Sequence, residues 1–437
     1  MKHTLRFLSY IILARVLLSC GNSKDDKPDS KVFGNVMILY SAGCNSLSAS
    51  LLDDIDELKS SYLPKNKNGQ DVVLVLSKSA RNNYKTKTSP VLFRLTDTGK
   101  KDKKGNAIVK SDTLLTLPAG TIAASSSTLR TVLEFVQSNF PSKSYGMVFS
   151  SHGTGWLPTG YYNDPLKYGD KAPGLRSLPE RRSDGGYLYK EPQYPEGTIL
   201  TKTLGQDLDY SVSQVAYELE VEDMASGIPF KLDYLLIDAC LMGGVEVAAA
   251  FENVASLVGF SPAEVLTDGF DYTRMTRHLA YGSTPNPKGV CEDYFNLYDR
   301  QSGVWHSATI TLVDTRNLSS LKNVCKTLFE KYRDQIASLT DGKVQEYGGN
   351  VHTFYDLEDI LLKAGISSSE QKSLEDALSS CVVYKGCTGQ YYSASDGKVH
   401  PVDIYSGLSM YLPAMGNSYL DNFYKSLSWN QATGLLK

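Results

Sequence analysis

The chain has 437 residues, enough for one large α/β domain with additions or for two ordinary domains. Its 41% hydrophobic and 21% charged residues are typical of a compact globular protein, so the composition indicates neither a disordered chain nor a multi-span membrane protein. The net charge is −3 and the basic residues are scattered, which argues against nucleic acid as a partner. No GxxxxGK[ST] or GxGxxG motif lies between a strand and a helix, so nucleotide chemistry is excluded too.

The N-terminus carries a targeting signal. Two basic residues precede an apolar run at residues 7–18, which is too short to span a membrane and is typical of a signal peptide. The run ends in LLSCG, which resembles a bacterial lipobox, so residues 1–20 are predicted to be a lipoprotein signal with Cys20 as the lipidated residue. The polar residues 21–34 are predicted to form a flexible tether. We expect an outer-membrane lipoprotein of a bacterial cell envelope, surface-exposed or secreted, that meets the membrane through its anchor only.

From residue 35 onward, short apolar runs alternate with amphipathic stretches, which predicts βαβ units and a mostly parallel sheet. The predicted strands are residues 36–40, 72–76, 91–95, 145–150, 232–237, 257–260, 309–313 and 408–412. The predicted helices are residues 47–58, 129–140, 211–224, 242–254 and 318–336, the second of them capped by Ser126 or Ser127. We expect a core over residues 35–268 and a helical and mixed C-terminal region over residues 269–437 that packs on it.

Two predicted strands end in reactive side chains. Strand 232–237 leads to Asp238 and Cys240, and strand 145–150 leads to His152. Open α/β sheets bind ligands beyond the carboxyl ends of their strands. The helix predicted after Cys240 would lower the pKa of the thiol through its N-terminal dipole. Taken singly, a buried structural thiol and an ordinary loop histidine are the commoner cases, but together at two strand ends the residues favour nucleophilic catalysis.

The blocks around these residues, SSHGTGW and LLIDACLMGGVEVA, resemble the His and Cys blocks of the clostripain family of cysteine peptidases. ILYSA followed by Asn45, GFSPAE, GFDY and SGLSMYLP also resemble family blocks, so the resemblance covers most of the chain from about residue 35. Cys44 departs from the pattern, because relatives tend to have an acidic residue there. The resemblance implies a caspase-like α/β/α sandwich with a mostly parallel central sheet, and an endopeptidase that cleaves proteins or peptides after basic residues.

The same resemblance assigns catalytic roles. Cys240 attacks the scissile carbonyl, and His152 protonates the leaving amine. The backbone N–H groups of Gly153 and Cys240 hold the oxyanion.

A pocket for Arg or Lys needs a carboxylate, because a cation is costly to desolvate without an opposite charge. Asp238, two residues before the nucleophile, is the first candidate for this carboxylate. Asp268 and Asp271 are further candidates, and a helix cap or a turn is the alternative explanation for each of them.

The stretch between the two blocks includes residues 157–204, a loop whose length indicates a functional or disordered segment. It contains the adjacent basic residues Arg181 and Arg182. Because clostripain relatives cut themselves in this loop, we predict that the enzyme is activated by cleavage after Arg181 or Arg182.

Alternatives to a cysteine peptidase find less support. The remaining histidines lack HExxH-like spacing, and Cys381 and Cys387 have no nearby histidine, so neither a metal nor another cofactor is predicted. A surface lipoprotein that keeps the fold as a binding module with a silent site is the second hypothesis. The intact pair of Cys240 and His152 argues against it.

Overall fold

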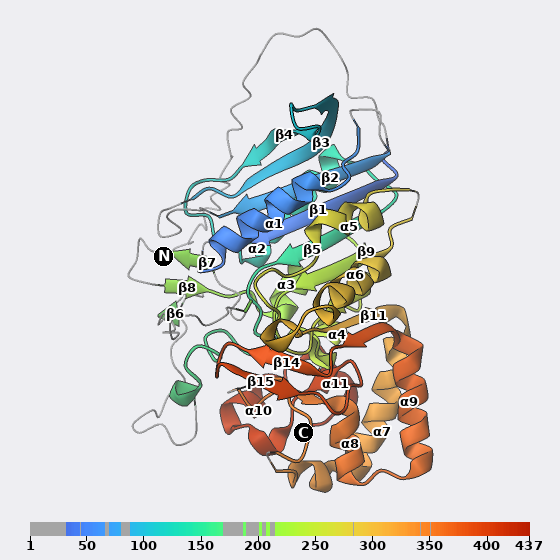
Figure 1. Ribbon diagram of the computed structural model, residues 1–437. Helices are drawn as coiled ribbons and strands as arrows, with labels where there is room; N and C mark the ends of the chain where they lie inside the picture. Colours follow the sequence, from blue (N-terminus) through green and yellow to red (C-terminus); the bar gives the residue numbers. More distant parts are fainter. Residues whose placement is uncertain are drawn as a thin grey trace, which may run out of the picture. The chain divides into compact units, whose positions relative to one another are not determined.

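A nine-stranded mixed sheet forms the centre of the fold (Figure 1). The computed structural model describes residues 32–43, 45–65, 70–79, 88–168, 187–188, 201–202, 207–209, 215–282, 284–340, 342–349 and 351–437. The strands of the large sheet are β1 (Asn35–Ala42), β2 (Asp71–Lys78), β3 (Val91–Lys101), β4 (Ala107–Thr116), β5 (Tyr145–Ser150), β9 (Leu232–Asp238), β10 (Ala255–Phe260), β11 (Thr309–Asp314) and β13 (Val382–Cys387). Their order in space is β13-β11-β10-β9-β5-β1-β2-β3-β4. The central strands β10, β9, β5, β1 and β2 run parallel, and the flanking strands are antiparallel.

The described residues also form smaller sheets and eleven α-helices. The small sheets contain β6 (Tyr187–Leu188), β7 (Asp207–Asp209) and β8 (Val215–Tyr217), then β12 (Tyr355–Asp356) with β16 (Ser409–Met410), and β14 (Gln390–Ser393) with β15 (Lys398–Pro401). The helices are α1 (Ser48–Ser60), α2 (Ser126–Asn139), α3 (Val221–Gly227), α4 (Val245–Ala250), α5 (Tyr272–Leu279), α6 (Pro287–Asp299), α7 (Leu318–Ala337), α8 (Leu357–Ala364), α9 (Ser368–Cys381), α10 (Ser418–Tyr424) and α11 (Ser428–Thr433).

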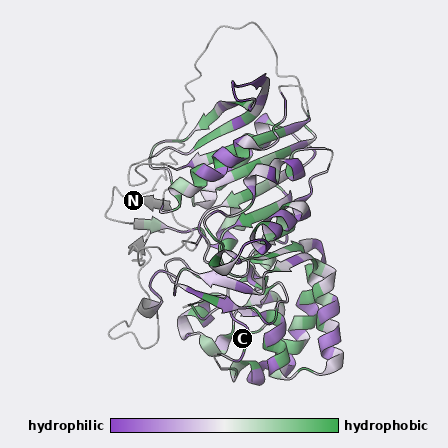
Figure 2. Cartoon of the chain, viewed as in Figure 1, coloured by the Kyte–Doolittle hydropathy of each residue, from purple (hydrophilic) through white to green (hydrophobic). Residues whose placement is uncertain are grey.

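Helices cover both faces of the central sheet. The step β1–α1–β2 moves in one direction across the sheet, whereas β5–α3–β9 and β9–α4–β10 move in the other. Because such crossovers are right-handed, α1 lies on one face and α3 and α4 lie on the opposite face. Helices α5 and α6 continue the row of α1, and α2 packs against α3. The central strands are hydrophobic along their length (Figure 2), and every residue of β1 is buried. The predicted α/β/α sandwich is confirmed.

The C-terminal region contributes to the same sheet. Strands β11 and β13 come from residues after 268 and extend the sheet beyond β10. Helix α7 packs against α8, α9 and α11, and α11 also contacts α4, which follows the strand that leads to Cys240. The C-terminal region is therefore in direct contact with the segment that positions this residue.

Several elements differ from the prediction. The residues predicted as a helix over 211–224 include strand β8 and the start of α3, whose first turn carries the helix-favouring acids Glu222 and Asp223. Strand β4 forms the edge of the sheet beyond β3, and its mostly exposed residues give little apolar signal. Ser125 caps α2 by accepting a hydrogen bond from the Thr128 N–H at 3.2 Å, so the cap lies one residue earlier than predicted.

The predicted signal peptide and Cys20 lie outside the described residues, as does most of the predicted tether, so all three stay predictions. Within the described ranges, no helix is both long enough and apolar enough to cross a membrane.

Glu246 on α4 is a buried acid that predicts a pH effect on stability. Its Oε1 accepts hydrogen bonds from the Tyr411 N–H at 2.9 Å and the Tyr424 hydroxyl at 2.8 Å, and its Oε2 has no hydrogen-bond partner among the described residues. Burial raises the pKa of Glu246 from 4.5 to about 7. An acid whose pKa rises on folding is destabilising once it ionises, so stability is lost as the pH rises through this window.

We therefore expect wild-type stability to fall by roughly 3 kcal/mol relative to Glu246→Gln between pH 4.5 and pH 8. Urea unfolding at both pH values measures this change, with both proteins in the Cys240→Ala background so that the reactive thiol is removed. A parallel pH dependence of the two unfolding free energies would contradict the prediction.

Candidate active site

The parallel pairing of β5 with β9 brings the predicted catalytic residues together. In this register Ser150 lies opposite Asp238, and two residues further along each strand the chain reaches His152 and Cys240. The two loops are in contact at Gly153, where an added Cβ would lie 2.4 Å from the carbonyl oxygen of Cys240. Both side chains thus lie beyond the carboxyl ends of neighbouring strands, as the sequence predicts.

Cys240 is fully buried in this structure. Its Sγ accepts a hydrogen bond from the Val265 N–H at 3.0 Å. Leu241 has a φ of 62°, and this left-handed residue turns the chain away from β9. Helix α4 begins only at Val245, so the thiol does not lie at a helix N-terminus as predicted. Burial raises the pKa of Cys240 well above its usual value, with the nearby charge of Glu264 adding to the shift. The predicted lowering of this pKa was therefore wrong for the conformation described here.

His152 is held by the loop that follows β1. Its Nε2 lies 3.2 Å from the Ser46 hydroxyl. The neighbouring Asn45 shapes this loop, because its Oδ1 accepts the Leu47 N–H at 2.9 Å. Burial lowers the pKa of His152 to about 3, although the Lys202 backbone favours the protonated ring. The imidazole is thus neutral at pH 7. Cys44, which departs from the family pattern, lies outside the described residues.

Residues 201–202 lie in the site and pair with residues 265–266 through backbone hydrogen bonds. The Lys202 carbonyl oxygen accepts the N–H groups of Gly153 at 2.9 Å and Cys240 at 3.3 Å, which are the two groups predicted to hold the oxyanion. The Lys202 N–H donates to the Val265 carbonyl at 2.8 Å, and Thr201 pairs antiparallel with Leu266. A peptide substrate bound to a protease by strand pairing has this arrangement of donors and acceptors.

The Lys202 side chain fills a buried acidic pocket. Its Nζ lies 2.5 Å from Asp238 Oδ2, 3.2 Å from Asp54 Oδ2 and 3.3 Å from the Ser150 hydroxyl. Tyr272 donates a hydrogen bond to the same Asp238 oxygen at 2.7 Å, and the ammonium lies over its ring. The lysine is 0% exposed, so these contacts replace its whole hydration shell.

Two carboxyl groups keep the buried Lys202 protonated. Burial alone would lower the pKa of Lys202, but the carboxylates of Asp238 and Asp54 outweigh burial and raise it. Burial raises the pKa of Asp54 to about 7, against the opposing effect of Lys202. The lysine is therefore a cation held by two acidic side chains, which is the partnership that a buried basic group requires.

Of the three predicted pocket aspartates, the structure brings one to the ammonium of Lys202. That residue is Asp238. Asp268 is exposed, and Asp271 caps α5 by accepting the Thr273 N–H at 3.1 Å. The alternative role left open for Asp271, a helix cap, is the one that its contacts support.

Asp54 and Lys202 were missed by the sequence analysis. Asp54 could have been found, because it lies on the apolar face of its helix between Leu51 and Leu58, where a charge indicates a buried partner. Lys202 lies inside the predicted loop 157–204, but no local pattern distinguishes it from the other basic residues there. The predicted cut sites Arg181 and Arg182 lie outside the described residues.

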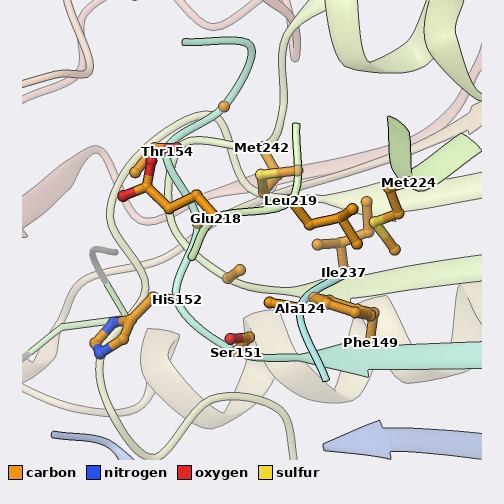
Figure 3. Close-up of a pocket in the computed structure, with 13 residues that line it drawn as sticks. Ala124, Phe149, Ser151, His152, Thr154, Glu218, Leu219, Met224, Ile237 and Met242 are labelled. Atoms are coloured by element: carbon orange, nitrogen blue, oxygen red, sulfur yellow. The ribbon is translucent and has the colours of Figure 1, made fainter. Parts of the chain in front are cut away.

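A small cavity of about 30 Å³ lies beside the His152 loop (Figure 3). Its wall includes the apolar side chains of Phe149, Met224, Ile237 and Met242, and His152 points away from them in Figure 3. The cavity is too small for a basic side chain. Nor do the described residues contain a group of three or more His, Cys, Asp or Glu side chains that could hold a metal ion.

Comparison with known families decides the identity of this site. The model of the clostripain family matches residues 39–168 and 185–434. The chain belongs to the clostripain family. This clostripain-family member is a cysteine peptidase, as its sequence blocks predict, and peptides or proteins are its substrates.

Solved structures share its fold. An inactive zymogen C11 protease from Parabacteroides distasonis is 24% identical, with a TM-score of 0.69 over 92% of this chain and 99% of that chain. A secreted C11 cysteine protease from Bacteroides thetaiotaomicron, in complex with an irreversible peptide inhibitor, is 22% identical, with a TM-score of 0.70 and the same two coverages. Comparison with curated protein sequences gave no match.

Proposed function

We propose that this clostripain-family peptidase cleaves after Lys or Arg, and that the chain is its uncut precursor, which cuts itself between Lys202 and Thr203. One observation carries the proposal. The Lys202 ammonium is bound by Asp238 while its carbonyl oxygen accepts the N–H groups of Gly153 and Cys240. These contacts support Lys202 as the cut site in place of Arg181 or Arg182.

The same contacts support a cysteine peptidase mechanism. The Cys240 thiol gives its proton to His152, and Sγ attacks the Lys202 carbonyl carbon while two backbone N–H groups stabilise the oxyanion. The bond from Lys202 to the Thr203 nitrogen then breaks, and His152 passes the proton to the departing amine. Water hydrolyses the thioester, which restores the thiol and leaves a carboxylate on Lys202.

Cutting frees the pocket for other substrates. While residues 201–202 stay in place, Cys240 and His152 are buried and both neutral, and a second basic side chain has no room beside Asp238. Departure of the new C-terminus removes the cover, and water then returns to the thiol and the imidazole. The pKa of Cys240 falls and that of His152 rises toward their ordinary values, which favours the thiolate.

N-terminal sequencing and intact mass of purified wild type and Cys240→Ala test the cut site. We expect a new N-terminus at Thr203 in wild type and an uncut Cys240→Ala chain. Lys202→Ala should lose this cut, whereas the matched variant Arg181→Ala/Arg182→Ala should keep it. Equal cutting of wild type and Cys240→Ala, or a new N-terminus at Ser183, would contradict the proposal.

Fluorogenic peptides test the specificity of the cut protein. We expect hydrolysis after Lys or Arg and none after Ala or Asp, because only a cation replaces the Lys202 ammonium between Asp238 and Asp54. Cleavage after Asp would overturn the acidic pocket. Failure of the cut protein to hydrolyse any peptide would favour the binding module.

A further inference from the structure

Thr201, the residue before Lys202, also has its side chain bound. It is 3% exposed, and its hydroxyl donates to Glu264 Oε2 at 2.5 Å. Glu264 directly precedes Val265, whose carbonyl pairs with the Lys202 N–H. The strand that aligns Lys202 with the nucleophile therefore also carries the acceptor for the preceding side chain.

Glu264 is a fixed acceptor rather than a mobile surface acid. It is 0% exposed, and its two oxygens are held by the Ser393 hydroxyl and by the Ala394 N–H, the latter at 3.0 Å. Ser393 ends strand β14, so the C-terminal region holds this carboxylate in place. All of these contacts, including that of Thr201, come from groups that can donate to the carboxylate.

We propose that Glu264 makes the peptidase select substrates with Thr or Ser immediately before the cleaved basic residue. This inference rests on the proposed function, because it treats residues 201–202 as a bound substrate. When the cut segment leaves, the Glu264 carboxylate loses one of its donors while Ser393 and Ala394 still hold it. An incoming Thr or Ser restores the missing hydrogen bond, whereas Val fills the same volume and leaves a buried charge short of a donor.

The selection favours exposed Thr-Lys and Ser-Lys sequences in extended segments of substrate proteins. Extended backbone is needed because residues 201–202 pair antiparallel with residues 265–266 through their backbone groups.

The experiment compares two matched peptide substrates of the cut wild-type enzyme, identical except for Thr or Val before the Lys. We expect kcat/KM to be about 10- to 100-fold higher for the Thr peptide, because a site built around a hydroxyl rejects an analogue without one. A second pair with Ser and Ala should differ in the same direction. If the Thr and Val peptides are both hydrolysed with equal kcat/KM, the inference is overturned and the proposed function is unaffected. If the chain does not cut itself and hydrolyses neither peptide, the inference about Glu264 and the proposed function are both overturned.

Variants then identify the acceptor. Glu264→Gln keeps an amide oxygen but removes the charge, so the Thr-to-Val ratio of kcat/KM should fall several-fold, whatever the change in absolute rate. Glu246→Gln is the matched control, since it makes the same change at another buried glutamate that does not contact Thr201. Its ratio should equal that of wild type. If the Thr-to-Val ratio of kcat/KM is unchanged in Glu264→Gln, another group binds the hydroxyl and the assignment to Glu264 is overturned.

Discussion

Asp238→Asn is expected to slow the cut after Lys202 by about 10²- to 10⁴-fold, because the change leaves a buried cation without its closest counter-charge. Asp238 Oδ2 contacts the Lys202 ammonium at 2.5 Å and also accepts the Tyr272 hydroxyl. Asp54, at 3.2 Å, is the remaining carboxylate and lies farther from the ammonium than Asp238 does. Asp54 therefore compensates only partly for the lost charge of Asp238, and Lys202 binds the pocket more weakly.

Cell-free synthesis followed over time by gel and intact mass measures the fraction of new Asp238→Asn chain that is cut. Asp233→Asn is the matched control, because it makes the same change on the same strand at an exposed position and should cut at the wild-type rate. Thermal unfolding of both variants in the Cys240→Ala background separates loss of folding from loss of recognition. Cutting of a folded Asp238→Asn chain at the wild-type rate would remove Asp238 from the specificity pocket.

The positions of Cys240, His152 and Asp238 follow from local sequence signals. Each residue comes directly at or after a short apolar strand, and the carboxyl ends of parallel strands meet at one edge of a sheet. The register of the two strands determines which side chains face each other. Because Ser150 pairs with Asp238, the loops that carry His152 and Cys240 lie side by side. Local pattern thus predicts where these side chains meet, although their protonation states depend on what covers them.

The residues that cover Cys240 and His152 could not be predicted from local sequence signals. Lys202 and Thr201 belong to a loop without periodicity, and their partners at Asp54, Asp238 and Glu264 are distant in sequence. No propensity or turn signal encodes such contacts, which depend on the complete fold. The error about the Cys240 pKa has the same origin. The predicted helix dipole is local, whereas the burial that raises the pKa comes from the rest of the fold.

Gly153→Ala should reduce the rate of the cut by about 10²- to 10³-fold, the usual effect of losing one oxyanion donor. The Gly153 N–H donates to the Lys202 carbonyl at 2.9 Å. An added Cβ would lie 2.4 Å from the Cys240 carbonyl oxygen and 2.8 Å from the Ala239 Cβ, so the two loops must separate. Gly153 is not among the glycines with positive φ, so the clash between loops, rather than backbone preference, opposes the substitution.

The time course of the cut in Gly153→Ala tests this expectation, and Gly34→Ala is the control, since the nearest atoms to its added Cβ are 3.3 Å away and belong to Gln70. Gly34→Ala should cut at the wild-type rate. If Gly153→Ala also keeps the wild-type rate, the N–H of Gly153 does not stabilise the transition state. A slow cut with an unchanged thermal midpoint instead locates the defect in the oxyanion contact. The lysine pocket is built from other residues, so Lys202 stays bound in this variant while its carbonyl loses one of its two donors.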